Sequence, residues 1–442
     1  MNIFILAALL LTSSVLQAQV PKLLPTGFQP LSIHQVEDTV HVFCNGNDID
    51  FDGIYEPNTG ELPASWLKYH AKSGNLLARR DITHTYFTIP FRPAFTNSMF
   101  YNAKGNTVEV YDLTSQQLID SAILTLPNSQ STITALCVLS LNFGSEEKTV
   151  IAISHKTSFT QNGTFGLYST IDKKIIAETE VGINPQMITP FKNLLGEVEF
   201  ALLCEGTFAG KNSKLYRLLP TPSSALPFKT IFFDLGDTGN FFVIRDQLAL
   251  TVMNGSHEII PINLATNVVL PGIPTGTMGY DGPRELVVDT ISNRVFISTY
   301  ASDIRIGSLL NGDVLGTLNP NGKPEGMAII NGSLWSCNAF KKGDYAPDST
   351  IAVFDIGVST LNERVEQGPL IALKNGICTI SLPQPIDAAD ILIMDVHGRM
   401  VQSKAISGQY VQLSMQDLSS GLYIIQIIDS KKKTEHLLLH SN

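Results

Sequence analysis

A short acidic run near the N-terminal end of the chain has residue types and spacing that suit chemistry. Asp48, Asp50 and Asp52 alternate with other residues, Gly53 follows the third aspartate, and Glu56 adds a further carboxylate. A hard cation such as Ca²⁺ takes several oxygen ligands at one point, so its loop must turn sharply. The four carboxylates therefore predict a structural Ca²⁺ site. The alternative is a solvated acidic hairpin.

The acidic run resembles the DxDxDG calcium loops found in several extracellular repeat proteins. An EF-hand requires a glutamate at the twelfth position of its loop, and that position is Thr59 here, so the run is not an EF-hand. The expected ligands are all local, with the Ile54 carbonyl as a neutral one, and none is a histidine. This favours a structural ion over a catalytic ion.

Other residues that carry catalysis are scattered. The sequence contains no GxSxG nucleophile elbow, HExxH zinc helix or Walker loop. Its nine histidines are dispersed, and the neighbours Ser256 and His257 have no assigned acid partner. We therefore assign no catalytic residue and no organic cofactor. Phe232-Phe233, Phe241-Phe242 and Trp335 suit either a ligand-binding face or core packing, and their strand spacing favours the core.

Composition excludes several classes of protein. The chain has 442 residues, 40 acidic and 30 basic side chains and a net charge of −10, so it does not suit the coating of a phosphate backbone, and we expect no nucleic-acid partner. Hydrophobic residues make up 44%, which is enough for a sizeable core. The five cysteines are widely separated and form no CxxC pair, which predicts buried thiols and no zinc site.

The N-terminal segment has the features of a secretory signal peptide over residues 1–18. Nine apolar residues run from Ile3 to Leu11, and Leu16-Gln17-Ala18 resembles a small-residue cleavage pattern. Nine apolar residues are too few to span a bilayer, and no later stretch approaches twenty, so we expect no transmembrane helix.

The elements that must position the acidic run are repeated strands. A template of alternating apolar residues, a polar turn and a second apolar pair recurs along the middle of the chain. The residues before its strands are Ser65, Thr107, Thr164, Lys214, Glu258, Asp303 and Thr350. Their spacing is 42 to 57 residues, which is typical of the four-stranded blade of a β-propeller. Short motifs precede several apolar strands: Asn184-Pro185, Gly282-Pro283-Arg284-Glu285 and Lys323-Pro324-Glu325-Gly326.

The repeat resembles the β-propellers of the surface-layer and YVTN type, in which a short strand ending in Asp precedes a polar turn and a second strand. Thr107 to Asp120 and Thr350 to Asp355 carry this resemblance best. It predicts an all-β chain with a seven-bladed β-propeller over residues 19–369. An open pair of β-sandwiches or a β-solenoid is the alternative, and seven copies favour a closed ring because closure leaves only short strand edges.

The last part of the chain, residues 370–442, predicts a second domain. Short strands are expected at 371–373, 378–382, 390–395, 400–405, 411–413, 421–428 and 435–439. Proline, glycine and serine breaks separate them, for example Pro383 to Pro385 and Ser407-Gly408. Seven short strands in this length suggest a small immunoglobulin-like β-sandwich.

This segment resembles the C-terminal sorting domain of proteins exported by the bacterial type IX secretion system. The matching residues are Ala389 to Asp395, Gly398 to Val401, Leu413-Ser414, Leu418, Gly421 to Ile427 and Lys431 to Lys433. The resemblance implies contact with the type IX machinery through residues 370–442. It also implies a protein that is secreted or held at the outer-membrane surface of a Gram-negative bacterium. The alternative is an ordinary immunoglobulin-like accessory module.

Two functions fit this organisation. The favoured one is an exported propeller that acts as a binding and display module for a protein, peptide or glycan, as a monomer, through loops on one face of the ring. The other is a propeller hydrolase or lyase with its active site at the central channel. The absence of a recognisable nucleophile or metal-ligand motif favours binding, although residues from distant blades can form a site that no motif reveals.

Overall fold

The computed structural model describes residues 20–50, 54–84, 86–87, 92–143, 146–207, 210–221, 227–309, 312–356, 370–374, 377–395, 399–415, 418, 421–429 and 433–440. The chain divides into two compact units, Met1–Val358 and Ser359–Asn442. The predicted boundary between 369 and 370 lies at the end of a segment, 357–369, that falls outside the described residues.

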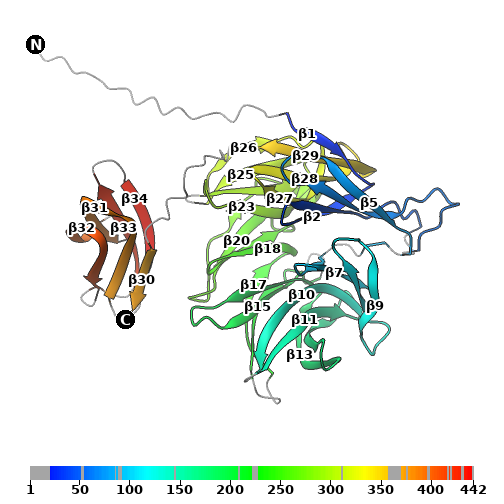
Figure 1. Cartoon of the computed structure of the whole chain (residues 1–442), viewed down its shortest axis with the longest axis horizontal. Helices are drawn as coiled ribbons and strands as arrows, with labels where there is room; N and C mark the ends of the chain where they lie inside the picture. Colours follow the sequence, from blue (N-terminus) through cyan, green and yellow to red (C-terminus); the bar gives the residue numbers. More distant parts are fainter. Residues whose placement is uncertain are drawn as a thin grey trace, which may run out of the picture. The chain divides into compact units, whose positions relative to one another are not determined.

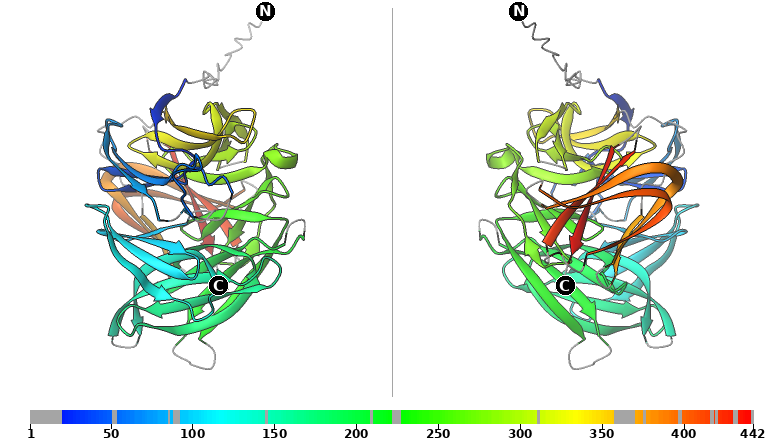
Figure 2. Two further views of the ribbon diagram at one scale, coloured as in Figure 1. Left: turned by 90° about the vertical axis from the view of Figure 1, so that its right-hand side faces the viewer. Right: turned by 90° about the vertical axis from the view of Figure 1, so that its left-hand side faces the viewer.

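The first unit is built from seven antiparallel sheets, the blades, which follow one another around a ring (Figures 1 and 2). Blade 1 contains β2 (Pro30–Val36), β3 (Thr39–Cys44), β4 (Ala64–His70) and β5 (Leu76–Ile82). Blade 2 contains β6 (Ala94–Phe95), β7 (Met99–Lys104), β8 (Thr107–Asp112) and β9 (Leu118–Thr125). Blade 3 contains β10 (Thr132–Phe143), β11 (Glu146–Lys156), β12 (Asn162–Ser169) and β13 (Lys174–Ile183).

The remaining blades complete the ring. Blade 4 contains β14 (Pro185–Lys192), β15 (Val198–Cys204), β16 (Ser213–Pro220) and β17 (Phe228–Gly236). Blade 5 contains β18 (Gly239–Arg245), β19 (Leu248–Met253), β20 (Glu258–Asn263), β21 (Val268–Val269) and β22 (Ile273–Pro274). Blade 6 contains β23 (Pro283–Asp289), β24 (Arg294–Thr299), β25 (Asp303–Ser308) and β26 (Val314–Leu318). Blade 7 contains β27 (Gly322–Ile330), β28 (Ser333–Lys341), β29 (Pro347–Asp355) and β1 (Lys22–Pro25).

The predicted seven-bladed β-propeller is confirmed. Each of the seven predicted repeats falls on the third strand of a blade, from β4 in blade 1 to β29 in blade 7. The ring is closed by β1, which pairs with β29 from Lys22 opposite Val353 to Pro25 opposite Thr350. Blade 7 is therefore assembled from both ends of the propeller, a feature that the repeat pattern did not predict.

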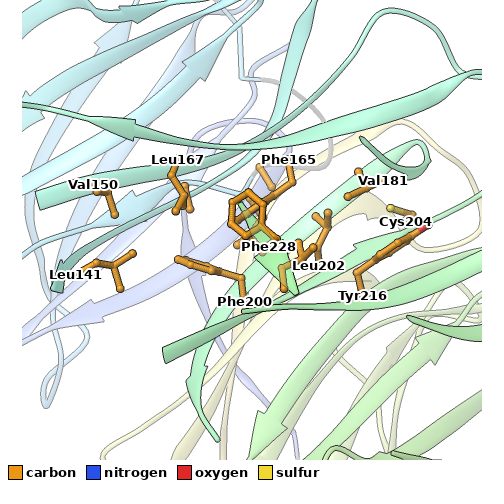
Figure 3. Packing of buried hydrophobic residues seen from close by; sticks show 14 residues of the cluster. Leu141, Val150, Phe165, Leu167, Val181, Phe200, Leu202, Cys204, Tyr216 and Phe228 are labelled. Atoms are coloured by element: carbon orange, nitrogen blue, oxygen red, sulfur yellow. The ribbon is translucent and has the colours of Figure 1, made fainter. Parts of the chain in front are cut away.

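Both faces of a blade are buried, which explains the continuous apolar runs in the middle strands. In β15, Phe200, Leu202 and Cys204 pack against blade 3, as Figure 3 shows, whereas Ala201 and Leu203 pack against blade 5. Similar clusters lie between every pair of neighbouring blades, including blades 7 and 1. The cysteines are free thiols, and four of the five are buried, as predicted.

The first strand of every blade begins at the same end of the ring. In a four-stranded antiparallel blade the fourth strand ends where the first begins, and the connection to the next blade is short, as between Ile183 and Pro185. We call this end the strand-start face. It carries the loops that join the second and third strands of each blade and those that join successive blades, including the 3-10 turn η1 (Gly279–Asp281).

The second unit contains β30 (Leu370–Lys374), β31 (Ile377–Asp395), β32 (Met400–Ser414), β33 (Gly421–Asp429) and β34 (Lys433–His440) (Figure 1). Two pairs of predicted short strands are continuous here, because β31 and β32 run through the expected breaks with register shifts instead of ending. The long β31 pairs with β30 and β32 in its first part and with β32 and β33 in its second. Buried residues such as Ile380, Ile391 and Ile425 form its core, which is consistent with an immunoglobulin-like β domain.

Candidate functional site

The acidic loop connects β3 to β4 in blade 1. Cys44, at the end of β3, pairs with Pro30 at the start of β2, so the loop lies on the strand-start face. Its two ends are joined by backbone hydrogen bonds between Asn47 and Leu62. They approach so closely that a Cβ atom on Gly46, whose φ is +86°, would lie 2.3 Å from the Leu62 carbonyl oxygen. The chain therefore folds back on itself at a glycine.

Glu61 organises this loop. Its side chain is buried, and its carboxylate accepts hydrogen bonds from the backbone N–H of Ile49 (3.1 Å), the backbone N–H of Glu56 (2.8 Å) and the hydroxyl of Tyr86 (3.2 Å). The N–H of Glu56 is the main cause that lowers the pKa of the Glu61 carboxyl below its ordinary value. Burial and the Glu61 charge raise the pKa of Tyr86, which stays a hydroxyl donor.

Two of the predicted metal ligands come together, and the third partner is a residue that the sequence did not indicate. One carboxylate oxygen from each of Asp48, Asp50 and Glu61 lies within 4.8 Å of the others. Asp52 lies outside the described residues, and Glu56 contributes its backbone N–H to Glu61. Two oxygens at 2.3–2.6 Å from one Ca²⁺ are separated by at most about 5 Å, so the spacing of the three oxygens is compatible with a shared ion.

A second group of charged residues lies at the ring axis, and we call it the axis cluster: Arg92, Arg284, Glu285, Tyr300, Lys323 and Glu325. Arg92 precedes β6 in blade 2, and its guanidinium donates to the carboxylate of Glu285 in blade 6 at 2.8 Å. It also lies 5.1 Å from the ring centroid of Phe241 in blade 5. These blades are not neighbours of blade 2, so Arg92 reaches across the axis of the ring.

The other members join blades 6 and 7. The Nε of Arg284 lies 3.4 Å from the Glu325 carboxylate, and its guanidinium lies 4.7 Å from the ring centroid of Tyr300. The Tyr300 hydroxyl donates to Glu325, and burial together with the Glu325 charge raises the pKa of Tyr300. Lys323 donates to the Tyr300 carbonyl oxygen at 2.8 Å.

Local irregularities in the strands place these residues. Register shifts occur at Pro283/Leu286 in β23 and at Pro324/Met327 in β27, and similar shifts occur at the starts of β2, β10, β14 and β18. Such bulges redirect side chains next to the strand. The two Pro motifs of blades 6 and 7 were predicted only as strand starts, and they also supply four charged members of the axis cluster.

A third polar group surrounds Glu205, which follows β15. Its carboxylate accepts from the side-chain amides of Gln186 (2.7 Å) and Asn184, and Asn184 in turn accepts from Lys156. Burial raises the pKa of Glu205, against the opposing charges of Arg284 and Lys156. Burial lowers the pKa of Lys156 to about 8, although Glu205 counteracts it. Burial likewise raises the pKa of Glu285, and Arg92 opposes that shift.

Burial lowers the pKa of two histidines of blade 1, His34 and His41. The ring of His41 is buried and its Nδ1 accepts from the indole N–H of Trp66 at 3.1 Å; burial, then the charge of Lys68, lowers its pKa to about 4. Burial lowers the pKa of His34 to about 3, with further contributions from His41 and Arg92. His257 contacts the hydroxyl of Thr277. These contacts suit packing better than proton transfer.

Comparisons with known proteins support both units. Residues 374–439 match the family described as Secretion system C-terminal sorting domain, which confirms the resemblance to the type IX sorting domain. A solved structure, "Structure of Dos1 propeller", is 10% identical with a TM-score of 0.54, and the match covers 78% of this chain and 97% of that chain. A computationally designed protein, Ika8, is also 10% identical, with a TM-score of 0.47 over 76% of this chain and 99% of that one. No curated protein matches the sequence.

These findings define a class of protein: a β-propeller that carries a type IX secretion sorting domain and is therefore secreted or exported to the cell surface. The sorting domain implies an interaction with the type IX machinery. No helix among the described residues is long and apolar enough to cross a membrane.

Proposed function

We propose that this protein is a binding and display module, exported to the surface of a Gram-negative bacterium or released from it, that recognises its ligand with the strand-start face. The supporting observation is the distribution of exposed aromatic side chains. Phe28, Phe159, Tyr280 and Tyr345 are 41%, 69%, 87% and 52% exposed, and all four lie in loops of this face. Aromatic side chains supply much of the energy of protein and glycan recognition.

The opposite face differs. Its exposed large apolar side chains among the described residues are aliphatic, for example Leu194, Leu195 and Ile291. The axis cluster lies at the same end of the ring, and the Arg284 side chain is the most exposed in its ion pairs, at 25%. Aromatic side chains and arginine are enriched at recognition surfaces.

The test is a search of glycan and peptide arrays with the processed chain, residues 19–442, followed by titration of each ligand found. Tyr280→Ala and Tyr345→Ala should each weaken binding at least tenfold, because each removes an exposed ring from the strand-start face. Leu195→Ala and Ile291→Ala on the opposite face are the matched controls and should leave the affinity unchanged. If only the control variants lose affinity for the ligands found, binding occurs on another face and the proposal is wrong.

A hydrolase or lyase is the second candidate, and the Lys156 and Glu205 pair favours it. Shifted pKa values in both a carboxyl and an amine are frequent at catalytic sites. Turnover of a ligand from the arrays that is abolished by Lys156→Met and retained by the Lys214→Met control would establish it. Turnover that is equal in both variants would exclude this pair.

The proposal also assigns export to the C-terminal unit. Residues from about Leu370 onward should be dispensable for folding of the propeller and necessary for release to the surface, because the two units form separate compact bodies. Deletion of 371–442 should leave the protein folded and trapped inside the cell envelope, as followed by fractionation and protease resistance. Normal release of the deleted chain would contradict this.

We further propose that the acidic loop binds a structural Ca²⁺ through Asp48 and Asp50, with Asp52 and Glu56 as the other ligands expected from the sequence. Glu61 is an additional ligand because its carboxylate lies with those of Asp48 and Asp50. Repulsion among neighbouring carboxylates is relieved by a divalent ion.

A further inference from the structure

Lys323 is a buried cation that makes no ion pair with a described residue. The residue is only 7% exposed, at the start of β27 in blade 7. In the part of the chain that the structure describes, no carboxylate lies within ion-pair distance of its ammonium group, and its hydrogen bond goes to the neutral carbonyl of Tyr300. Burial of an uncompensated charge is costly, so such a group calls for an explanation beyond stability.

The surroundings of Lys323 are aromatic. Its Nζ lies 4.5 Å from the ring centroid of Tyr345 and 5.9 Å from that of Tyr300. Phe340 packs edge-on against both tyrosines, with centroid separations of 6.0 Å and 5.6 Å, and so fixes their rings. Tyr345 is half exposed, so this aromatic group extends from the buried ammonium to the surface.

The charges of the axis cluster leave an anion missing. Glu285 pairs with Arg92, and Glu325 pairs with Arg284. Glu205, whose charge interacts with Arg284 and Lys156, brings the count to three carboxylates against four cations, and Lys323 is the cation left over.

Lys68 is also buried on an aromatic ring, 5.8 Å from the Trp66 centroid, and donates to the Thr114 carbonyl oxygen, but that ring is buried, whereas Tyr345 reaches the surface. Lys214 is different. Lys214 lies 4.1 Å from the centroid of Phe232, and it also has a carboxylate partner, Asp234, at 3.4 Å.

We propose that Lys323, with the rings of Tyr300 and Tyr345, forms a binding site for a carboxylate-bearing sugar, a uronate. A pyranose uronate presents an apolar C–H face and a carboxylate on one rigid ring, so it stacks on Tyr345 while its carboxylate approaches Lys323. An acidic peptide carries its carboxylate on a flexible chain that leaves the tyrosine face uncovered. This inference rests on the proposed binding function of the strand-start face and names its ligand class.

The experiment is calorimetric titration of the processed chain, residues 19–442, with an oligogalacturonate at low salt. The same oligosaccharide as its methyl ester keeps the ring and removes the charge, and should bind at least tenfold more weakly. Lys323→Met should weaken oligogalacturonate binding at least tenfold, and the matched control Lys214→Met should not. Added salt should weaken the native interaction, because an ion pair carries part of it.

A second measurement separates a ligand-binding role from a structural one. Lys323→Met replaces an unpaired buried cation with an apolar side chain of similar length, so the melting temperature without ligand should stay the same or rise. A fall in melting temperature together with an unchanged affinity would assign Lys323 to folding and overturn the site.

The remaining outcomes are also decisive. No binding of oligogalacturonate at millimolar concentration, or equal binding of its methyl ester, overturns the uronate site. If poly-glutamate binds instead, and Lys323→Met abolishes that binding, the site recognises an acidic peptide and the uronate proposal is wrong. In both cases the proposed binding function still holds if Tyr280→Ala and Tyr345→Ala weaken the binding of another ligand. It is wrong if the binding of no ligand depends on the strand-start face.

Discussion

The acidic loop and the axis cluster lie on the same face of one ring, and they are built in opposite ways. The residues of the acidic loop come from one stretch of chain between β3 and β4, and backbone N–H groups hold its central carboxylate. The axis cluster joins residues from blades 2, 6 and 7, and side-chain charges hold it together. Arg92 and Glu285, its closest ion pair, are 193 positions apart.

This difference has a consequence for stability. A group that joins distant blades can form only when the ring is complete, so its loss should affect the whole propeller. A group within one loop can change without disturbing the other blades. The effects of substitutions on stability should therefore be larger in the axis cluster than in the acidic loop, and they should extend to more blades.

The largest effect is expected for Arg92→Met. The substitution leaves the buried Glu285 carboxylate without its cation, and breaking a buried ion pair typically costs about 3–5 kcal/mol of the free energy of unfolding. Chemical denaturation measures it. Arg79→Met is the control, because the Arg79–Asp81 pair is 44% and 46% exposed and such pairs contribute less than about 1 kcal/mol.

A double variant tests the interpretation. Arg92→Met with Glu285→Met removes both charges, so it should recover much of the stability that the single change loses. If Arg92→Met costs no more than Arg79→Met, the axis cluster does not join the blades and the contrast with the acidic loop disappears.

Leu24→Ala should have the next largest effect. Leu24 is the buried residue of the closing strand β1 and packs in the cluster between blades 7 and 1. Truncation of this side chain should lower the free energy of unfolding by about 2–5 kcal/mol. The loss should lie towards the lower end of this range because an edge strand can relax around the cavity. If the axis cluster depends on a closed ring, hydrogen exchange near β23 and β27 should rise with that near β1. Faster exchange at β1 alone would show that the two are independent.

The pH dependence should have opposite signs in the two regions. The folded pKa of Glu61 lies below its unfolded value, so the stability it contributes is present above pH 4.5 and is lost as the pH falls through the folded pKa. The folded pKa of Glu285 lies above its unfolded value, so in the window between the two the folded state binds more protons and stability rises as the pH falls.

Glu61→Gln and Glu285→Gln separate these contributions. Relative to the native chain, Glu61→Gln should flatten the loss of stability on acidification, and Glu285→Gln should make that loss steeper. Melting temperatures between pH 3 and pH 7 measure both. The same change of slope in both variants would contradict the contrast.

The sequence predicted the fold well because the fold depends on local patterns. Alternating apolar residues identify a strand, and the third strand of every blade was recognised from residues within a few positions of one another. The closing strand β1 was missed because Lys22 to Pro25 shows no repeat of its own and pairs with residues more than 300 positions away. In the second unit, proline and glycine breaks were taken for strand ends, whereas β31 and β32 continue through them with register shifts.

The candidate sites follow the same rule. Asp48 and Asp50 stood out because alternate carboxylates are visible in the sequence, and Glu61 did not because its role depends on backbone N–H groups that only the folded loop presents. Arg284, Lys323 and Glu325 were noticed beside prolines at strand starts. Their partners come from other strands and other blades, so no spacing along the chain reveals the cluster.

The smallest effect is expected for calcium. At ten to one hundred times its dissociation constant, Ca²⁺ that binds only the folded loop should stabilise the protein by about 1.4–2.7 kcal/mol and raise the melting temperature by a few degrees. Asp50→Asn removes one proposed ligand and should abolish both the binding heat and this rise, whereas Asp246→Asn, in the turn between β18 and β19, should keep them. Because Glu61 is already held by N–H donors, the loop should remain folded without the ion, and Ca²⁺ should slow hydrogen exchange only around residues 47–62.

No binding heat and no calcium-dependent rise in the melting temperature of the native chain would leave the acidic loop as a solvated hairpin. Slowed exchange across all seven blades would instead show that this loop is coupled to the whole ring, as the axis cluster is expected to be.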